Sequence, residues 1–391
     1  MNKRTSRETV KLDRLVPGGQ SIGTLADGKK AFVWGALPGE VVEFEITKSK
    51  KSYVEGIVKK VISNSSHRIE PKDDCYLSTS PWQTMNYDYE LEQKSELICE
   101  AFRQQGVKIN KPSMITDNKQ FGYRNKMEYS LYWDNDEDVI KLAFRKRGTH
   151  TKLPIESSSI EREEILEEAK RIIADLNARG EQARKYQSLL VRCDQSGQVS
   201  SALFENYKPR PKMQPLTDKL LDFEYSYSPN GFFQINLPVY EMVLSKVKES
   251  ISTDKVVDMY AGVGTIGLSV ARDKDLTLVE VDGSAFAELA KNTEQLKTVK
   301  AVHSSTEGAL DHIVSDATII VDPPRAGLHE SVVQKLSQAL PPVIIYLSCN
   351  PITQARDIAP LLSKYKIELM QGYNFFPRTP HIENLVTLKR N

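Results

Sequence analysis

The sequence predicts an α/β protein with three domains: a small N-terminal β-barrel, a β-rich α+β region, and a C-terminal doubly wound sheet. From residue 228 onward, short apolar strands alternate with helical segments, which is the pattern of a parallel sheet covered by helices on both faces. Residues 8–62 consist of short runs separated by glycine and proline turns, as in small barrels. We therefore place the domains at residues 1–65, 66–227 and 228–391.

The composition is that of a globular protein large enough to hold two or three cores. The chain has 391 residues, of which 40% are hydrophobic and 27% are charged, the usual mixture of soluble domains. No apolar run approaches the roughly 20 residues that span a bilayer, and no apolar signal region follows the basic N-terminus. We expect a cytoplasmic protein without a membrane partner. The net charge of +1 means that any surface for nucleic acid must be a local patch.

The N-terminal region is predicted to be all β. Dipeptides with turn chemistry, Gly18-Gly19, Asp27-Gly28 and Pro38-Gly39, separate its strands. The strands are expected at residues 8–12, 31–34, 41–46 and 54–61. Lys48, Lys50 and Lys51 fall near one hairpin, with Tyr53 beside them. They form either a solvated loop or a site for single-stranded RNA, which such barrels bind with basic and aromatic side chains.

A longer stretch of this region has a family resemblance. The segment from Gly19-Gln20-Ser21-Ile22-Gly23 to Ala36-Leu37-Pro38-Gly39-Glu40 resembles the TRAM domain. That resemblance implies an RNA-binding barrel of the OB type.

The central region mixes strands with helices. Residues 67–83 are rich in Ser, Pro and Asp and are predicted to be irregular, whereas residues 89–105 have helical spacing. The other elements are expected as strands at 127–133, 140–144 and 188–193, an amphipathic helix at 160–178 and a boundary loop at 208–215. The basic run Phe144-Arg145-Lys146-Arg147-Gly148 is either a solvated hairpin tip or a contact for phosphates.

Three predicted strands of the C-terminal domain are each followed by residues of the types that bind ligands or take part in catalysis. Strands are expected near residues 255–260, 276–281, 300–303, 317–321 and 343–348. The first is followed by a glycine loop, the fourth by Asp322-Pro323-Pro324-Arg325, and the fifth by Cys349. Open α/β sheets place their ligands at the carboxyl ends of their strands. We therefore expect the loop, a carboxylate and a thiol to meet at one edge of a Rossmann-like sheet.

The glycine loop alone leaves the cofactor open. Gly262-Val263-Gly264-Thr265-Ile266-Gly267 fits the G-x-G-x-x-G pattern, and Asp282 follows at the distance expected of a ribose-binding acid. A nicotinamide dinucleotide and S-adenosylmethionine both suit this geometry. Asp258 favours the methyl donor, because an acid there would stand near the donor's ammonium group. Glu280 competes for the role of ribose acid, and we prefer Asp282 because it lies nearer the end of the strand.

Four motifs that occur in order establish a wider resemblance. They are Phe233-Gln234-Ile235-Asn236, Asp322-Pro323-Pro324-Arg325-Ala326-Gly327-Leu328, Leu347-Ser348-Cys349-Asn350-Pro351 and His381-Ile382-Glu383-Asn384. Together with the TRAM-like start, they resemble the RNA uracil-5-methyltransferase family over essentially the whole chain. The resemblance implies an S-adenosylmethionine-dependent enzyme that makes 5-methyluridine in structured RNA.

The resemblance also implies roles for individual residues. Cys349 is expected to be the nucleophile and Glu383 the base. The residues expected at the S-adenosylmethionine site are Gln234, Tyr260, Gly262, Gly264, Thr265, Asp282, Ser305 and Asp322. The two catalytic residue types fit the chemistry, because carbon 5 of uracil becomes nucleophilic once a thiolate has added to carbon 6. A carboxylate can then remove the proton from carbon 5.

The sequence leaves open which RNA is the substrate and which class of protein the chain belongs to. The TRAM-like start favours 23S ribosomal RNA, and a T-loop uridine of transfer RNA is the alternative. A nicotinamide-dependent oxidoreductase would explain the glycine loop but would leave Cys349 and Glu383 without roles. A non-catalytic RNA-binding protein would explain the barrel only.

The cysteines predict neither a disulfide framework nor a metal site. The four, which form no C-x-x-C pair, are Cys75, Cys99, Cys193 and Cys349. Many members of the family hold an iron–sulfur cluster on three clustered cysteines and a fourth further along. Here Cys75 remains, residues 77–82 contain no cysteine, and Ser157-Ser158-Ser159 occupies the later position. Because four thiolates are the usual ligand set, we expect no cluster.

Overall fold

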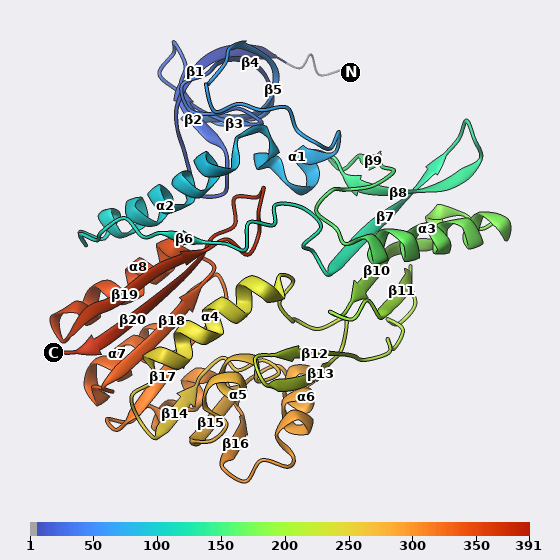
Figure 1. The fold of residues 1–391 in the computed structure, drawn as a ribbon. Coiled ribbons are helices and arrows are strands. Elements are labelled where there is room, and N and C mark those ends of the chain that lie inside the picture. Colours follow the sequence, from blue (N-terminus) through green and yellow to red (C-terminus); the bar gives the residue numbers. More distant parts are fainter. Residues whose placement is uncertain (1–5) are drawn as a thin grey trace.

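The computed structural model describes residues 6–391, and its N-terminal part is a closed barrel (Figure 1). The strands of the barrel are β1 (Arg7–Leu15), β2 (Ser21–Thr24), β3 (Lys30–Trp34), β4 (Val41–Ser49) and β5 (Tyr53–Ser63). Alternate side chains such as Val10, Leu12, Val42 and Phe44 fill its interior. The predicted barrel is confirmed. The structure adds β2, which is too short to give a clear alternating pattern.

The central part is a five-stranded sheet, in the order β11-β10-β7-β8-β9, with a helix packed against it. Its elements are β7 (Lys126–Asp134), β8 (Val139–Arg145), β9 (Lys152–Pro154), α3 (Glu163–Ala178), η2 (Ala183–Lys185), β10 (Tyr186–Cys193) and β11 (Val199–Glu205). Ile165, Ala169 and Leu176 of α3 are buried against sheet residues such as Tyr129 and Val191. The expected strands and helix are confirmed, although the helix begins at Glu163 because residues 160–161 pair with the loop before β7.

The basic run after β8 forms a hairpin tip, but one of its side chains is not solvated. The guanidinium carbon of Arg147 lies 4.0 Å from the ring centroid of Trp34 in β3, a cation–π contact. The Arg147 side chain also donates a hydrogen bond to the carbonyl of Leu77, and burial lowers its pKa. Arg147 therefore joins the central sheet to the barrel, a role that neither of the two alternatives for this run included.

The C-terminal part is an eight-stranded sheet in the order β16-β15-β14-β17-β18-β20-β19-β6. Its strands are β6 (Met114–Ile115), β14 (Lys255–Asp258), β15 (Asp275–Glu280), β16 (Val299–His303), β17 (Ala317–Val321), β18 (Val343–Ser348), β19 (Tyr365–Tyr373) and β20 (Glu383–Arg390). The strands β14 to β18 are parallel, as predicted. Because β20 runs antiparallel to both β18 and β19, the sheet is mixed rather than wholly parallel.

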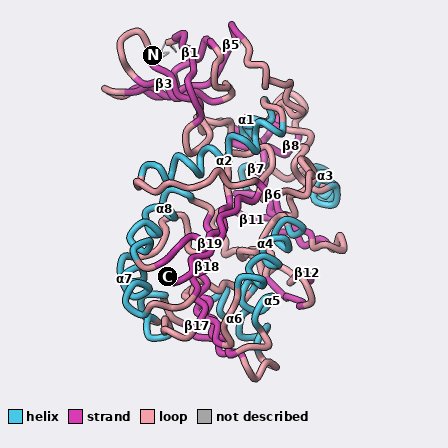
Figure 2. Tube along the Cα trace, turned by 60° about the vertical axis from the view of Figure 1, so that its left-hand side comes forward, coloured by secondary structure: helices cyan, strands magenta, loops and turns pink. Residues whose placement is uncertain are grey.

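Helices cover both faces of this sheet, which confirms the doubly wound arrangement. They are α4 (Leu237–Ser250), α5 (Thr265–Ala271), α6 (Gly283–Thr293), α7 (Glu330–Ala339) and α8 (Pro351–Ile358), with short turns η3 (Thr306–Gly308), η4 (Leu310–His312) and η5 (Ala359–Ser363). Figure 2 shows α7 and α8 on one side of the strands and α4, α5 and α6 on the other. Successive residues of β18 serve the two faces. Ile344 joins the apolar cluster under α7 and α8, and Ile345 joins the cluster under α4 and α5.

Two segments that precede residue 228 also pack on this sheet. The short helices α1 (Tyr76–Thr79) and η1 (Pro81–Thr84) lead into α2 (Tyr87–Gln104), while β12 (Leu216–Leu220) pairs with β13 (Phe223–Tyr227). Ile98 and Phe102 of α2 join the cluster under α7 and α8, and Tyr225 of β13 joins the opposite cluster. The strand β6 pairs with β19. The domain limits expected at residues 65 and 227 stay a prediction.

The part of the chain that the structure describes contains no helix that combines the length and the apolar character needed to cross a membrane. The cytoplasmic location expected from the sequence stays a prediction.

Candidate active site

Cys349 and Glu383 occupy opposing positions at the carboxyl edge of the sheet because of how β18 and β20 pair. These strands are antiparallel, and their last recorded pair is Ser348 with Asn384. Cys349 and Glu383 are the next position in that register. Directly opposed residues of an antiparallel pair have Cβ atoms about 5 Å apart. Two residues from motifs more than thirty positions apart are thus brought together by the backbone ladder.

Helix α8 fixes this register from one side. Gln354 is fully buried, and its Nε2 donates to the carbonyls of Tyr346 over 2.9 Å and Asn384 over 3.0 Å. Its Oε1 accepts from Nδ2 of Asn384 over 2.7 Å. These partners lie in β18 and β20, so a slip of one strand past the other would leave buried polar groups unpaired. The spacing of Cys349 and Glu383 is therefore held by α8 as well as by the ladder.

The thiol and the carboxyl group share their surroundings with Asp322, which follows β17. Burial raises the pKa of Cys349 to about 11, and the carboxylates of Glu383 and Asp322 add to the rise. Burial also raises the pKa of Glu383 well above its usual value, again with a contribution from Asp322. Arg325 opposes both shifts. Cys349 of the free protein is therefore a thiol at neutral pH, and Glu383 holds a proton more readily than a surface carboxyl group.

A cavity of about 330 Å³ opens onto Cys349. Its lining consists of Pro17, Gly18, Leu97, Arg325, Cys349, Asn350, Pro351, Ile352, Pro380, His381 and Ile382. Nη2 of Arg325 lies 3.2 Å from Nδ1 of His381, and because arginine only donates, Nδ1 is the acceptor. Burial, followed by the charge of Arg325, lowers the pKa of His381 to about 4. We name this space the nucleophile cavity: it presents a thiol, a guanidinium group and a neutral imidazole.

Helix α2 holds the loop that joins β19 to Glu383. Nζ of Lys94 donates to Oδ1 of Asn374 over 2.6 Å and lies 2.9 Å from Oε1 of Glu90. Glu90 in turn accepts from the backbone N–H of Arg378 over 3.0 Å. Both Lys94 and Glu90 are fully buried. A buried ion pair on one helix thus orients the segment that precedes Glu383.

A second cavity, of about 720 Å³, lies over the glycine loop, and we name it the donor cavity. Five of the expected donor contacts line it: Tyr260, Gly262, Thr265, Asp282 and Asp322. The loop needs glycine for two reasons. Gly262 and Gly264 have φ of 58° and 95°, a region that favours glycine, and a Cβ on Gly267 would lie 2.3 Å from Leu278. The backbone can therefore come close to a bound nucleoside, so the site fits S-adenosylmethionine.

Two acids near the end of β15 line the donor cavity and are held differently. Oδ1 of Asp282 caps α6 by accepting from the backbone N–H groups of Ser284 over 3.0 Å and Ala285 over 2.9 Å. Glu280 accepts from the backbone N–H of Gly262 over 2.8 Å through Oε2. Glu280 therefore contacts the glycine loop itself. The preference for Asp282 as the ribose acid stays a prediction, with Glu280 as the second candidate.

Three of the expected donor contacts lie away from the lining of the donor cavity. Gly264 is the N-cap of α5. Gln234 is buried, and its carbonyl accepts from Nδ2 of Asn125 over 3.1 Å. Ser305 caps η3 by accepting from the backbone N–H of Gly308 over 3.1 Å. Their roles in donor binding stay predictions.

The acids that end β14 and follow β17 have different roles. Asp258 is fully buried and accepts from the backbone N–H of Gly267 over 3.0 Å. It holds the glycine loop, and its expected place near the donor's ammonium group stays a prediction. Asp322 lines the donor cavity and also raises the pKa values of Cys349 and Glu383. Burial, followed by the charge of Asp258, raises the pKa of Asp322 to about 7, so this acid stands between the two cavities.

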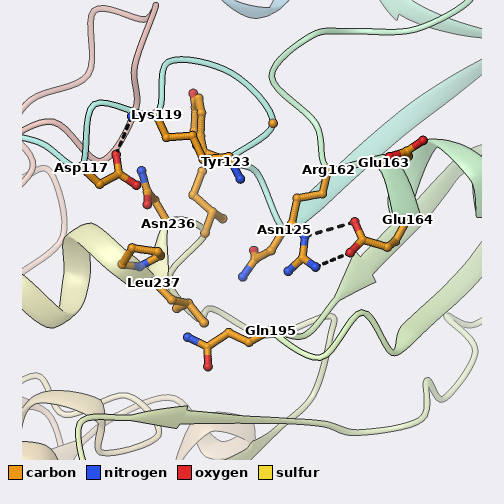
Figure 3. Close-up of a pocket in the computed structure, with 13 residues that line it drawn as sticks. Asp117, Lys119, Tyr123, Asn125, Arg162, Glu163, Glu164, Gln195, Asn236 and Leu237 are labelled. Atoms are coloured by element: carbon orange, nitrogen blue, oxygen red, sulfur yellow. Dashed lines mark hydrogen bonds and ion pairs between the residues drawn. The ribbon is translucent and has the colours of Figure 1, made fainter.

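A third cavity, of about 510 Å³, lies where the central sheet meets the start of α4 (Figure 3). Figure 3 shows Asn125, Arg162 and Gln195 around it. Within residues 6–391, the buried Oδ1 of Asn125 has no hydrogen-bond partner. Arg162 is held by Glu164 and by the carbonyl of Asp194, the latter over 2.8 Å. Ile235 and Asn236 of the first family motif line this cavity, but the motif alone could not predict it because the rest of the lining comes from separate parts of the chain.

Cys75 lies beside the serine run at the later cluster position. Its Sγ is 3.8 Å from the carbonyl oxygen of Ser157, and Asp73 accepts from the hydroxyl of Ser159 over 2.8 Å. Among the residues that the structure describes, no group of three or more His, Cys, Asp or Glu side chains could hold a metal ion. That the protein lacks a cluster stays a prediction, which the iron content and visible absorbance of the purified protein would check.

Comparison with known sequences covers both ends of the chain. A model of the TRAM domain matches residues 3–59, and a model of the tRNA (uracil-5-)-methyltransferase family matches residues 293–391. The chain is 30% identical to the tRNA (uracil(54)-C(5))-methyltransferase of Pyrococcus horikoshii, over 90% of this chain and 94% of that protein. It is 27% identical to an uncharacterised RNA methyltransferase of Bacillus cereus, over 97% of this chain and 96% of that protein.

Comparison with solved structures extends the similarity to the whole fold. The crystal structure of Pyrococcus abyssi tRNA (uracil-54, C5)-methyltransferase in complex with S-adenosyl-L-homocysteine superposes with a TM-score of 0.76 at 24% identity, covering 98% of this chain and 100% of that chain. The order of barrel, central sheet and mixed C-terminal sheet is thus that of a known enzyme fold. With the identity and coverage of the Pyrococcus horikoshii relative, the conclusion is that the chain belongs to the RNA uracil-5-methyltransferase family.

Proposed function

We propose that the protein methylates carbon 5 of a uridine in structured RNA, with S-adenosylmethionine as donor, Cys349 as nucleophile and Glu383 as base. The observation that carries the proposal is the pairing of β18 with β20, which sets Cys349 opposite Glu383 beside Asp322. Asp322 also lines the donor cavity over the glycine loop, a concave site of the size that small ligands occupy. The family and a relative solved with S-adenosyl-L-homocysteine support the donor.

In the proposed reaction, the thiol of Cys349 gives its proton to solvent, and the resulting thiolate forms a bond from Sγ to carbon 6 of uracil. The electrons of the 5,6 double bond shift toward the carbonyl at carbon 4, and carbon 5 becomes nucleophilic. S-adenosylmethionine, when bound, supplies an electrophilic methyl group. Glu383 then accepts the proton from carbon 5, the bond between sulfur and carbon 6 breaks, and the double bond re-forms. Glu383 must be ionised to act in this step, and once ionised its raised pKa makes it a stronger base than a surface carboxylate.

The RNA target has two candidates, each supported by a different observation. The TRAM domain at residues 3–59 is the feature from which the sequence favours 23S ribosomal RNA. The name of the Pyrococcus horikoshii relative, which specifies uracil 54 of transfer RNA, favours a T-loop uridine. RNA from a strain that lacks the gene would decide: the purified protein and labelled S-adenosylmethionine should label one fraction, either 23S ribosomal RNA or transfer RNA.

The catalytic roles are tested by two variants on that same RNA. Cys349→Ala should form no covalent adduct and no 5-methyluridine, because the first bond cannot form. Glu383→Gln should transfer one methyl group and then stall, because the proton on carbon 5 has no acceptor. Its methylated protein–RNA adduct should survive denaturing electrophoresis and map to Cys349 by mass spectrometry. Normal turnover by Glu383→Gln would assign the base elsewhere, and an adduct with Cys349→Ala would overturn the nucleophile.

Ligand binding would distinguish the proposed methyltransferase from an oxidoreductase and from a non-catalytic RNA-binding protein. Binding to the native state raises the midpoint of thermal unfolding by an amount that grows with the logarithm of the ligand concentration divided by Kd. S-adenosyl-L-homocysteine should therefore stabilise the protein, and NAD should not. Stabilisation by NAD would favour an oxidoreductase, and stabilisation by neither would favour a non-catalytic RNA-binding protein.

A further inference from the structure

We propose that the loop between β1 and β2 of the barrel, residues 16–20, is a wall of the site that receives the target nucleotide. On this proposal Pro17 and Gly18 contact that nucleotide and limit access to Cys349. The barrel would then be part of the active site, beyond any contact it makes with more distant RNA. The inference rests on the proposed function, since it names what touches the uridine at the same site.

The first argument is the composition of the nucleophile cavity. Pro17 and Gly18 line it together with Cys349, Arg325 and His381. Pro17 and Gly18 are exposed, so their surfaces are free to meet a ligand. The barrel and the thiol lie more than three hundred positions apart in the chain, yet they bound one cavity of about 330 Å³. A nucleobase of the RNA that reaches Cys349 through this cavity therefore passes residues 16–20.

The second argument is that the loop is built into a rigid junction and is not a free tether. Backbone hydrogen bonds close it, from Gly19 N–H to the Val16 carbonyl over 3.0 Å and from Val16 N–H to the Gln20 carbonyl over 2.9 Å. Gly19 packs so closely on Pro380 that an added Cβ would lie 2.5 Å from the Cβ of that proline. Because Pro380 directly precedes His381, the barrel touches the segment that leads to Glu383, the proposed catalytic base.

Trp82 connects residues 16–20 to the loop between β19 and β20 through two hydrogen bonds. Nε1 of Trp82 donates to the carbonyl of Gly19 over 3.0 Å, and the backbone N–H of Trp82 donates to the carbonyl of Arg378 over 3.0 Å. Trp82 is 2% exposed. One buried residue, through its side chain and its backbone, thus holds the barrel loop and the loop between β19 and β20 at a fixed separation.

Gly18 offers a direct test, because a side chain there would add bulk at the cavity and displace no protein atom. A Cβ on Gly18 would meet no atom within 4 Å, and its φ is 96°. Gly28, in the turn between β2 and β3, is a matched control: its φ is 85°, and an added Cβ would again meet nothing within 4 Å. Gly28 is not part of the lining of the nucleophile cavity. Substitution should therefore cost both positions the same backbone strain.

The experiment compares Gly18→Ala, Gly18→Leu, Gly28→Ala and Gly28→Leu in the full-length protein, with RNA from the strain that lacks the gene as substrate. Gly18→Leu should lower kcat/KM for RNA roughly tenfold or more, as misfit groups do in substrate pockets, and Gly18→Ala should fall between it and wild type. The Gly28 variants should stay within about twofold of wild type, the usual range for surface changes. Binding of S-adenosyl-L-homocysteine should be unchanged in all four variants.

A second measurement isolates the step. In a Glu383→Gln background, where the adduct accumulates, Gly18→Leu should slow formation of the protein–RNA adduct, and Gly28→Leu should not. Thermal melting of the two Leu variants should agree, because their strain is the same. Equal kcat/KM at positions 18 and 28 would overturn the proposal, since the loop would then border the cavity without touching the nucleotide. Failure of the wild-type protein to methylate any RNA would instead overturn the proposed function.

Discussion

At the scale of residues, the proposed nucleophile Cys349 is protonated in the free protein. Burial, Glu383 and Asp322 together raise the pKa of Cys349 to about 11, whereas the thiolate is the form that attacks. Arg325 is the group that opposes the shift. We therefore expect slow alkylation and oxidation of Cys349 in the free protein, and in the proposed reaction the thiol loses its proton once RNA is in place.

The reactivity of Cys349 should follow the charges around it. Arg325→Met removes the opposing cation, so the pKa should rise further and alkylation by iodoacetamide at pH 8 should slow. Asp322→Asn removes a carboxylate that raises the pKa, so alkylation should quicken. Peptide mass spectrometry would measure both rates, and Cys99, whose pKa shift involves neither group, is the internal control. Equal rates in the two variants would contradict this electrostatic account.

Asp322 should make donor binding depend on pH. Its pKa in the free protein is raised to about 7, and a cationic donor favours the ionised carboxylate. Below pH 7 the proton must leave on binding, so affinity for S-adenosylmethionine should weaken by up to about tenfold per pH unit. Above about pH 8 it should be constant. Calorimetric titration from pH 5.5 to 8.5 would test this, and Asp322→Asn should flatten the profile.

Prediction from sequence succeeded for residues placed by strand ends and failed for those placed by packing. Cys349 and Asp322 directly follow apolar runs, so their meeting at one sheet edge was predictable. Asp258 has the same sequence context, yet its carboxylate is taken by the N–H of Gly267, a choice that depends on how α5 docks. Pro17 reaches the nucleophile cavity through barrel placement, for which no local pattern exists.

At the scale of elements, the antiparallel strand β20 is what joins the thiol to the base. The sequence predicted the five parallel strands because buried strands are continuous apolar runs. The strand β20 has a mostly apolar run, Leu385-Val386-Thr387-Leu388, but neither its direction nor its place between β18 and β19 can be read from composition. The two residues of β6 are too few for any periodic signal.

The ion pair of Glu90 and Lys94 should be essential to folding. Glu90→Gln would leave Lys94 buried and unpaired, and breaking one partner of a buried pair costs about 3–5 kcal/mol. Urea unfolding should show this loss in the free energy of unfolding. Glu100→Gln on the same helix is the control, because Glu100 pairs with an exposed Arg103, and such pairs contribute about 0–1 kcal/mol. Similar losses from the two variants would show that the buried pair does not hold the loop.

At the scale of the whole molecule, the barrel lies at one end of the protein and has two regions that we expect to contact RNA. Its β1–β2 loop touches the nucleophile cavity. Its β4–β5 hairpin carries exposed Lys50 and Lys51 beside Tyr53, and the edge of the Tyr53 ring meets Phe32. Lysines next to aromatic rings are the arrangement with which barrels bind single strands.

The hairpin lysines should appear in the salt dependence of RNA binding. Replacing Lys50 and Lys51 with Gln should reduce the slope of log affinity against log salt by about 0.7 to 1.4, since each phosphate contact on a single strand contributes about 0.7. Lys297→Gln with Lys300→Gln is the control, because these lysines are exposed near β16 at the opposite end of the molecule (Figure 1). An unchanged slope in the hairpin variant would place the RNA elsewhere.

The packing of α2 and β6 on the C-terminal sheet limits how related genes can recombine. After a single crossover near residue 228, the product would take Glu90 and Lys94 from one parent and Asn374 from the other. Asn374 lies in the loop that this ion pair contacts. A crossover near residue 65 would keep that network intact and would need a match where Gly19 meets Pro380, where Trp34 meets Arg147 and where Glu40 pairs with Arg68. Barrels should therefore be exchanged between lineages more readily than the parts of the catalytic sheet.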